Sequence, residues 1–200
     1  SGVAGLYCAL NLPGDKKILL VTKETLEASD SSLAQGGICV MRGEEDYSSF
    51  VEDTLKAGHY ENHKEAVDLM IRKSPALVQD LLDLGVRFQK EGDELVYTKE
   101  GGHSKARILY HGDQTGQEIT RALISEILTR QTVALAQEVI WMDILVDNGV
   151  CHGVVLRSKE GSITEIMSDY VVVATGGLGG LYHQSTNYRH LTGDGIAIAL

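Results

Sequence analysis

The sequence predicts an α/β fold in which a parallel sheet carries helices on both faces and is extended by a β-meander. Two glycines, Gly2 and Gly5, are spaced for a tight turn that leads into an apolar, helix-like run at 6–12. A continuous apolar strand is expected at 16–21. Residues 132–174 contain short strands separated by hairpin signals, which is typical of a meander.

The composition is that of a folded domain without a nucleic-acid partner. The 200 residues are 43% apolar, which is enough to bury a sizeable core in one or two domains. A formal net charge of -10 repels nucleic-acid phosphates. Three isolated cysteines without C-x-x-C spacing indicate a reducing compartment. Because no signal-peptide pattern or membrane-spanning apolar run is found, we expect a cytoplasmic protein without a membrane span.

The opening Ser1-Gly-Val-Ala-Gly5 has the form of the end of a G-x-G-x-x-G turn, whose first glycine would precede residue 1. In such a turn, Gly2 lets the backbone approach a pyrophosphate and Gly5 lets the helix pack close to its strand. The helix N-terminus then presents free N–H groups to the anion. We expect the segment 29–38, S-D-S-S-L-A-Q-G-G-I, to meet this opening in space.

Scaffold helices follow. Apolar spacing and end signals predict three of them, over 46–58, over 63–72, and from the Ser74-Pro75 pair to Gly85. His59 and His63 stand four residues apart, but the H-E-x-x-H order is absent and no third ligand is evident, so no metal site is expected.

A second motif lies after two short strands, which are expected at 86–88 and 95–97. Residues 100–116 have the form E-G-G-H-S-x-x-R-I-L-x-H-x-x-D-x-T-G, and the Thr115-Gly116 pair is expected to cap a helix that ends at 129. A carboxylate such as Glu100 can pair with a substrate ammonium and orient the carbon beside it. Most glutamates are simply exposed loop residues, and that alternative stays open for Glu100.

The last third is rich in strands. They are expected at 132–135, 138–146, 151–156, 163–167 and 170–174. The strand at 170–174 is apolar throughout and is expected to be fully buried, to return to the parallel sheet and to deliver the Thr175-Gly176-Gly177 turn. Gly193-Asp194-Gly195 then opens a helix over 196–200, for which Asp194 is a candidate N-cap.

The Gly-rich opening together with the Ala34-Gln35-Gly36-Gly37 segment resembles the flavoprotein family of fumarate reductase, succinate dehydrogenase and L-aspartate oxidase. Within it, the E-G-G-H-S form resembles the L-aspartate oxidases. The resemblance implies a Rossmann-like FAD-binding domain over 1–200, truncated at both ends, with a helical and loop insertion at about 46–114 and without the capping domain. It implies non-covalent FAD, because Asp30 stands where succinate dehydrogenase-like members carry the histidine that links to the flavin.

The resemblance also implies a set of cofactor-binding residues. They are Ser1, Gly2, Gly5, Lys23, Ser31, Ser32, Ala34, Gln35, Gly36, Gly37, Ile140, Ala174, Thr175, Gly176 and Asp194. Five of these assignments keep an alternative. Glu24 competes with Lys23 for the adenosine ribose, the two serines can be turn or helix caps, Ile140 can be an ordinary strand residue, and Asp194 can be an N-cap.

The activity implied is oxidation of L-aspartate to iminoaspartate, the first step of NAD synthesis, with hydride passing to flavin N5 and reoxidation by dioxygen or fumarate. Quinolinate synthase is then a possible partner. Glu100 would orient the substrate and His103 is a second candidate for contact with it, whereas Arg107 would pair with Glu100 or Asp113 and His111 would brace the loop. The substrate-binding arginine and histidines of the family would follow Leu200, so the 200 residues are not expected to be active alone.

Two other functions compete with this interpretation. A succinate dehydrogenase or fumarate reductase-type flavoprotein would carry an apolar residue at 100 and usually a histidine at 30. A non-catalytic nucleotide-binding fragment would bind adenosine phosphates without redox chemistry.

Overall fold

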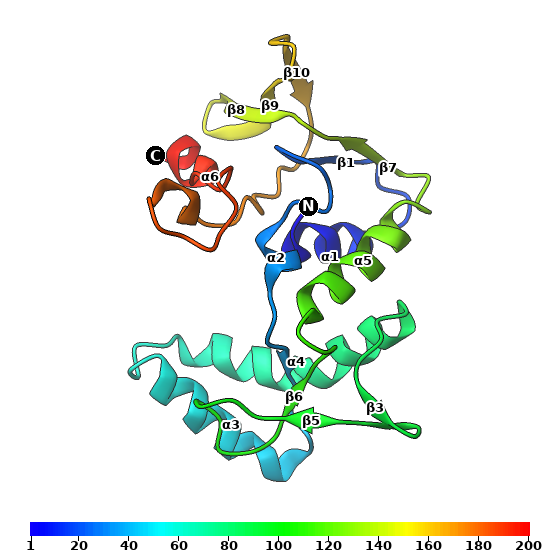
Figure 1. Ribbon diagram of the computed structural model, residues 1–200. Coiled ribbons are helices and arrows are strands. Elements are labelled where there is room, and N and C mark those ends of the chain that lie inside the picture. The colour runs from blue at the N-terminus through cyan, green and yellow to red at the C-terminus, as the bar shows by residue number, and fades with distance from the viewer. The chain divides into compact units, whose positions relative to one another are not determined.

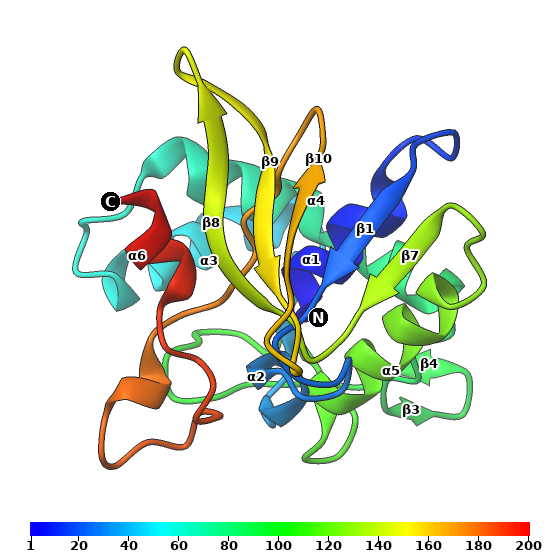
Figure 2. The same cartoon turned by 90° about the horizontal axis from the view of Figure 1, so that it is seen from above.

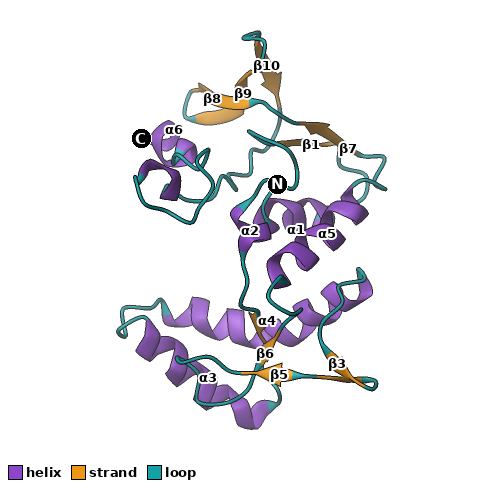
Figure 3. Ribbon diagram, viewed as in Figure 1, coloured by secondary structure: helices purple, strands orange, loops and turns teal.

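The computed structural model describes residues 1–200, which form two compact units (Figure 1). The first unit comprises 1–33 and 123–200, and the second comprises 34–122. Each unit contains both helices and strands (Figure 3). The structure contains no helix that could span a membrane.

In the first unit, a parallel strand pair lies beside the first helix. β1 (Ile18–Val21) pairs with β7 (Val133–Ala136) in parallel, and α1 (Val3–Asn11) packs against β1 (Figure 2). Leu6 and Leu20 are buried. The predicted helix-to-strand step is therefore confirmed, although the helix begins three residues earlier and the strand two residues later than expected.

A three-stranded antiparallel meander follows, in the order β10-β9-β8 (Figure 2). Its strands are β8 (Ile140–Asp147), β9 (Val150–Arg157) and β10 (Ile163–Met167). The β8–β9 turn places Asn148 and Gly149 at φ 50° and 77°, the left-handed conformation that an Asn-Gly hairpin turn requires. The predicted meander is confirmed.

The strand predicted at 170–174 is wrong. These residues form no strand, and Tyr170, Val172 and Val173 are 88%, 60% and 54% exposed. A strand needs a hydrogen-bonded neighbour, and none of the described strands pairs with this segment. The chain continues through η1 (Gly179–Leu181) to α6 (Asp194–Ala199), which packs on β8.

The second unit is built on two helices. α3 (Glu44–Ala57) packs against α4 (Lys64–Asp83) around the buried side chains of Phe50, Val67 and Ile71 (Figure 1). The helix predicted at 46–58 is thereby confirmed, with Gly58 as its C-cap.

The prediction of separate helices on either side of Ser74-Pro75 is wrong, because α4 runs through Pro75 without a break. Proline has no N–H for the carbonyl of Ile71, four residues earlier. The Ser74 hydroxyl donates to that carbonyl instead, at 2.7 Å, and accepts the Met41 N–H at 2.9 Å. The side chain thus repairs the bond that the proline removes.

Short strands complete the second unit. β2 (Ile38–Cys39), β6 (Ile108–Leu109) and β5 (Tyr97–Thr98) form an antiparallel sheet in that order. β3 (Lys90–Glu91) and β4 (Glu94–Leu95) form a hairpin.

The strand predicted at 86–88 is wrong, whereas the strand predicted at 95–97 is confirmed in part, because β4 ends at Leu95 and β5 begins at Tyr97. Val86 and Phe88 are buried, but they lie in a loop. The alternation of apolar residues at 86–88 indicates burial, and residues can be buried in a loop as well as in a strand.

Two further helices complete the chain. α2 (Asp30–Leu33) is a single turn in the first unit. α5 (Thr115–Ile127) ends two residues before the predicted boundary. Thr115 is not its side-chain cap, because its hydroxyl donates to the Gly36 carbonyl at 3.1 Å and accepts the His111 N–H at 2.9 Å.

Candidate cofactor and substrate site

In the first unit, Ser31 meets the Gly-rich opening as predicted. Its hydroxyl accepts the N–H of Val3, in the first turn of α1, at 3.0 Å. A Cβ on Gly2 would lie 3.2 Å from the same oxygen. Farther along α1, a Cβ on Gly5 would lie 3.5 Å from the Cβ of Ala174. The turn therefore brings Gly2, Gly5, Ser31 and Ala174 together beside a helix N-terminus, which suits an anion.

The neighbouring hydroxyls are engaged within the chain. Ser32 donates to the carbonyls of Glu27 and Ser29 at 2.8 and 2.7 Å, so it caps the turn before α2. The hydroxyls of Ser1 and Thr22 are 2.9 Å apart. The capping alternative thus describes the contacts of Ser32 in this structure.

Asp30 is bound by a later loop. Its Oδ1 accepts the Tyr188 N–H at 2.9 Å, and its Oδ2 accepts the Asn187 side-chain amide. Asp30 therefore holds the 187–188 segment through the Asn187 side chain and the Tyr188 backbone.

Lys23 and Asp194 lie together, as two cofactor candidates should, but they bind each other. The Lys23 ammonium is 2.8 Å from Asp194 Oδ2 and also donates to Thr192 Oγ1 and the His190 carbonyl, at 2.7 and 3.0 Å. Burial alone would raise the pKa of Asp194, but the hydrogen bonds from Lys23 and Thr192 lower it below its ordinary value. Asp194 is not the N-cap, because Gly193, at φ 73°, occupies that position.

A cavity of about 520 Å³ brings together the residues proposed for the adenosine. Lys23, Glu24 and Ile140 all line it, so both candidates for the ribose face the same space. The turn of the meander at 157–161 closes another side.

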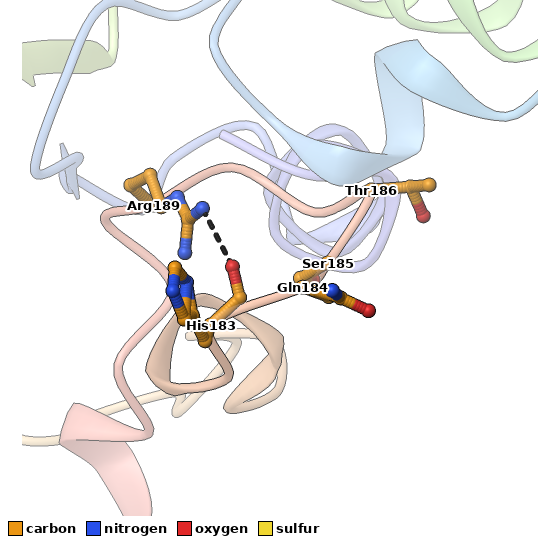
Figure 4. Close-up of a pocket in the computed structure, with 5 residues that line it drawn as sticks. All are labelled: His183, Gln184, Ser185, Thr186 and Arg189. Carbon is orange, nitrogen blue, oxygen red and sulfur yellow. Dashed lines mark hydrogen bonds between the residues drawn. The ribbon is translucent and has the colours of Figure 1, made fainter.

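A second cavity, of about 660 Å³, lies in the loop 183–189 (Figure 4). Arg189 donates to the carbonyls of Tyr182 and His183 at 2.8 and 2.9 Å, which brings its guanidinium beside His183. Sequence reasoning did not predict this cavity, since a loop of polar residues between glycine turns carries no periodic signal.

In the second unit, the Ala34-Gln35-Gly36-Gly37 segment lies against the E-G-G-H-S loop. A Cβ on Gly36 would lie 3.1 Å from Glu100 Oε1, so the carboxylate covers this glycine. A Cβ on Gly37 would collide with Ile108 and with the Leu109 carbonyl oxygen. Only glycine therefore fits at 37 without a shift of its neighbours.

His103 is held by Cys39 and by the backbone. Its ring Nε2 is 3.2 Å from the Cys39 sulfur, and its backbone N–H donates to the Glu100 carbonyl at 3.0 Å. Its Nδ1 is buried and has no hydrogen-bond partner. Burial raises the pKa of the Cys39 thiol, Glu100 raises it further and Arg107 opposes both, so the thiol stays protonated near neutral pH.

Arg107 pairs with neither Glu100 nor Asp113, contrary to the prediction. It is fully buried and binds Asp46 through two nitrogens, at 2.8 and 3.1 Å, and Asp53 through a third. The hydrogen bonds from Arg107 are the main cause that lowers the pKa of Asp46 to about 2. Neither aspartate carries a sequence signal beyond its place on an amphipathic helix, where a polar residue is expected to face solvent.

His111 braces the loop as predicted. Its Nδ1 bonds to the Arg87 carbonyl.

Comparison with known proteins places this geometry in a family. A family model described as an FAD binding domain matches residues 1–200. The chain belongs to the FAD-binding domain family. The cofactor prediction of FAD is therefore confirmed at the level of the family.

Relatives of this FAD-binding domain include L-aspartate oxidases. It is 43% identical over 200 residues to the L-aspartate oxidase of Clostridium perfringens, covering 100% of this chain and 45% of the relative. It is 34% identical over 206 residues to the chloroplastic L-aspartate oxidase of Arabidopsis thaliana, covering 100% and 32%. The chain thus spans less than half the length of these relatives.

Solved structures confirm the fold class. The domain superposes on Mycobacterium smegmatis Sdh1 in complex with UQ1 with a TM-score of 0.94 at 27% identity, covering 100% of this chain and 36% of that one. It matches an E245Q variant of the Escherichia coli quinol fumarate reductase FrdA with a TM-score of 0.93 at 28% identity, covering 99% and 35%. The predicted α/β FAD-binding fold is that of the flavoprotein subunits.

The residues present fit FAD. In the first unit, Gly2 carries no side chain at the N-terminus of α1, and the Ser31 hydroxyl accepts only the Val3 N–H, so a phosphate can approach the other first-turn N–H groups. In the second, Gly36 presents backbone rather than a side chain beside Glu100. Both features suit a cofactor with an anionic and a flat aromatic part.

Proposed function

We propose that the protein oxidises L-aspartate to iminoaspartate with FAD as its cofactor. The observation that carries this proposal is the Glu100 carboxylate beside Gly36 in the A-Q-G-G segment. A dicarboxylate without an amino group would meet a repelling charge there, whereas the ammonium of an amino acid would be attracted. The relatives named L-aspartate oxidase support the same substrate.

In the first unit, we assign the FAD phosphates and adenosine to the residues around α1 and the 520 Å³ cavity. Ser1, Gly2 and Gly5 would shape the phosphate turn, with Ser31 and Ser32 beside it. Lys23 and Ile140 line the cavity. Lys23 would act there partly through its bond to Asp194, since its ammonium already has three acceptors. The remaining assignments in this unit are Ala174, Thr175, Gly176 and Asp194.

In the second unit, Ala34, Gln35, Gly36 and Gly37 would line the flavin ring. Glu100 would bind the substrate ammonium and so orient the Cα hydrogen. We retain His103 as a second contact, since its buried Nδ1 has no partner in the chain. When bound, FAD supplies the two-electron acceptor, and the protein supplies position and charge.

FAD is proposed to be non-covalent, because residue 30 is Asp and its carboxylate binds the Asn187 side-chain amide and the Tyr188 backbone N–H. Dioxygen or fumarate would reoxidise the flavin. The product would pass to NAD synthesis in the cytoplasm, where quinolinate synthase is a possible consumer. We also propose that 46–114 is an insertion in the FAD-binding domain.

A dicarboxylate dehydrogenase remains the second candidate, favoured by the structural match to the Sdh1 and FrdA chains. The discriminating test uses the full-length protein loaded with FAD and freed of oxygen. L-Aspartate should bleach the flavin absorbance and succinate should not, and Glu100→Phe should abolish the bleaching. Bleaching by succinate alone would assign the protein to the dehydrogenases. No bleaching by either substrate would leave only the FAD-binding assignment.

A further inference from the structure

One carboxylate oxygen of α3, Asp53 Oδ2, binds the loop that carries Glu100 at two places, and Asp46, Ser49 and Glu45 of the same helix bind Arg107 or Lys105 of the loop. Asp53 Oδ2 accepts three donors, which are the Ser104 N–H at 2.8 Å, the Ser104 hydroxyl at 2.8 Å and an Arg107 guanidinium N–H. We call residues 100–107 the substrate loop. Asp53 is thus the point at which α3 binds both the middle and the end of this loop.

Arg107 makes the anchor rigid. Its guanidinium is fully buried, stacks 4.8 Å from the Phe50 ring centre and is held by both oxygens of Asp46. The Asp53 side chain is 17% exposed, so water competes weakly for these bonds. A buried guanidinium with two carboxylate partners has little freedom to move, because breaking either pair would leave charge unpaired.

The other end of the loop is fixed by its backbone and by the His103 side chain, whose Nε2 lies 3.2 Å from the Cys39 sulfur. The Glu100 carbonyl accepts the His103 N–H, and the next residue, Ser104, is bound to Asp53. The Glu100 carboxylate itself accepts no hydrogen bond and forms no ion pair in the chain, although it lies beside Gly36. Its position is therefore set by the loop backbone, and its charge is free for a ligand.

We infer that Asp53 is a positioning residue for substrate recognition, which acts by fixing the substrate loop so that Glu100 stays over Gly36. The inference rests on the proposed function, in which Glu100 binds the substrate ammonium. A displacement of about 1 Å at a substrate-binding group can reduce turnover about 100-fold. Removing the Asp53 carboxylate frees Ser104 in the middle of the loop, and this should weaken the use of L-aspartate without removing any group that touches the substrate.

A double-mutant cycle in the full-length, FAD-loaded protein tests this coupling. The variants are Asp53→Ala, Glu100→Gln and the double variant, and the readout is kcat/KM for L-aspartate. Asp53→Ala should raise KM roughly 10-fold or more. Because Asp53 acts through Glu100, the double variant should be no worse than Glu100→Gln alone. If the fold-losses in kcat/KM of the two single variants multiply in the double variant, the inference is overturned.

Matched variants separate positioning from stability. Asp68→Ala breaks an aspartate bond to Arg72 and Tyr47 in the same unit without touching the substrate loop, and it should leave KM unchanged. Ser104→Ala removes one donor to Asp53 and leaves the Arg107 pairs intact, so it should raise KM in the same direction by a smaller factor. An equal rise in KM for Asp68→Ala would refute a specific role for Asp53.

Hydrogen exchange supplies a readout independent of catalysis. In full-length protein without FAD, the amides of 101–105 should exchange faster in Asp53→Ala than in the unmodified protein or in Asp68→Ala. Unchanged exchange would show that Asp53 does not hold the loop. If the unmodified protein fails to oxidise L-aspartate, the proposed function fails and the recognition role falls with it, whereas active protein with independent losses refutes the positioning role alone.

Discussion

The carboxylate of Glu100 lies over Gly36, with Oε1 3.1 Å from the point where a Cβ would stand. The Glu100 carboxylate is the end of a flexible side chain. A methyl group added at Gly36 would therefore displace the carboxylate rather than prevent folding. Gly36→Ala should therefore raise KM for L-aspartate several-fold and change the melting temperature little. Gly14→Ala is the control, because Gly14 lies outside the substrate loop and a Cβ there meets nothing within 4 Å. Equal KM values for the two variants would contradict the contact.

Gly37 differs from Gly36, because the atoms that a Cβ would meet at Gly37 cannot move aside. A Cβ there would collide with the Ile108 side chain and the backbone oxygen of Leu109, both in or beside the sheet of the second unit. Gly37→Ala should lower the free energy of unfolding by about 1–3 kcal/mol through overpacking. Urea unfolding measures this, with Gly14→Ala as the control at an open position. Identical midpoints would argue against the close approach.

Lys23 should hold the 190–194 loop in place. Lys23→Met removes the donor shared by His190, Thr192 and Asp194. The pKa of Asp194 should rise toward its ordinary value, and the amides of 190–194 should exchange faster. Lys17→Met, at an exposed residue without an ion pair, controls for loss of charge. FAD affinity should fall in the first variant only, and equal affinities would oppose the assignment.

Low pH should weaken the ion pairs that Arg107 forms with Asp46 and Asp53. Burial alone would raise the pKa of Asp53, but hydrogen bonds from Ser104 and Arg107 lower it to about 2, and the pKa of Asp46 is also about 2. Both pKa values lie below the ordinary value of 3.8. Between pH 4 and 2 the unfolded chain therefore binds more protons than the folded chain. Stability present above pH 4 is therefore lost as pH falls through this window, by about 2 kcal/mol for each group.

The measurement is the free energy of unfolding at pH 6, 4, 3 and 2, with the Asp46→Asn variant beside the unmodified protein. The variant should be less stable at neutral pH and lose less stability on acidification. Parallel pH curves would mean that Asp46 does not contribute to the slope.

Local signals predicted much of the fold. Asn148-Gly149 fixes a hairpin through backbone conformation alone, and Gly58 ends α3 as expected. The segment 170–174 shows the limit of such reasoning, since β-forming residues pair only where a neighbouring strand is available. Apolar composition cannot reveal that neighbour.

The position of a site residue could be predicted where it follows from a short local motif. The meeting of Ser31 with Gly2 was expected from two short motifs, whereas the contact between Glu100 and Gly36 was not predicted. The partners of Arg107 were not predicted either, because Asp46 and Asp53 lie more than 50 positions away on a helix face that also suits solvent. Long-range ion pairs have no spacing rule that a sequence could display.

Ser74 and Pro75 are coupled in their tolerance to substitution. With proline at 75, the serine hydroxyl is the replacement donor for the Ile71 carbonyl, so loss of the hydroxyl leaves a buried acceptor without a partner. With alanine at 75, the main chain would supply that donor and the serine would become less important. The two positions are therefore epistatic, and the proline must change before the serine if the Ile71 carbonyl is to keep a donor at every step.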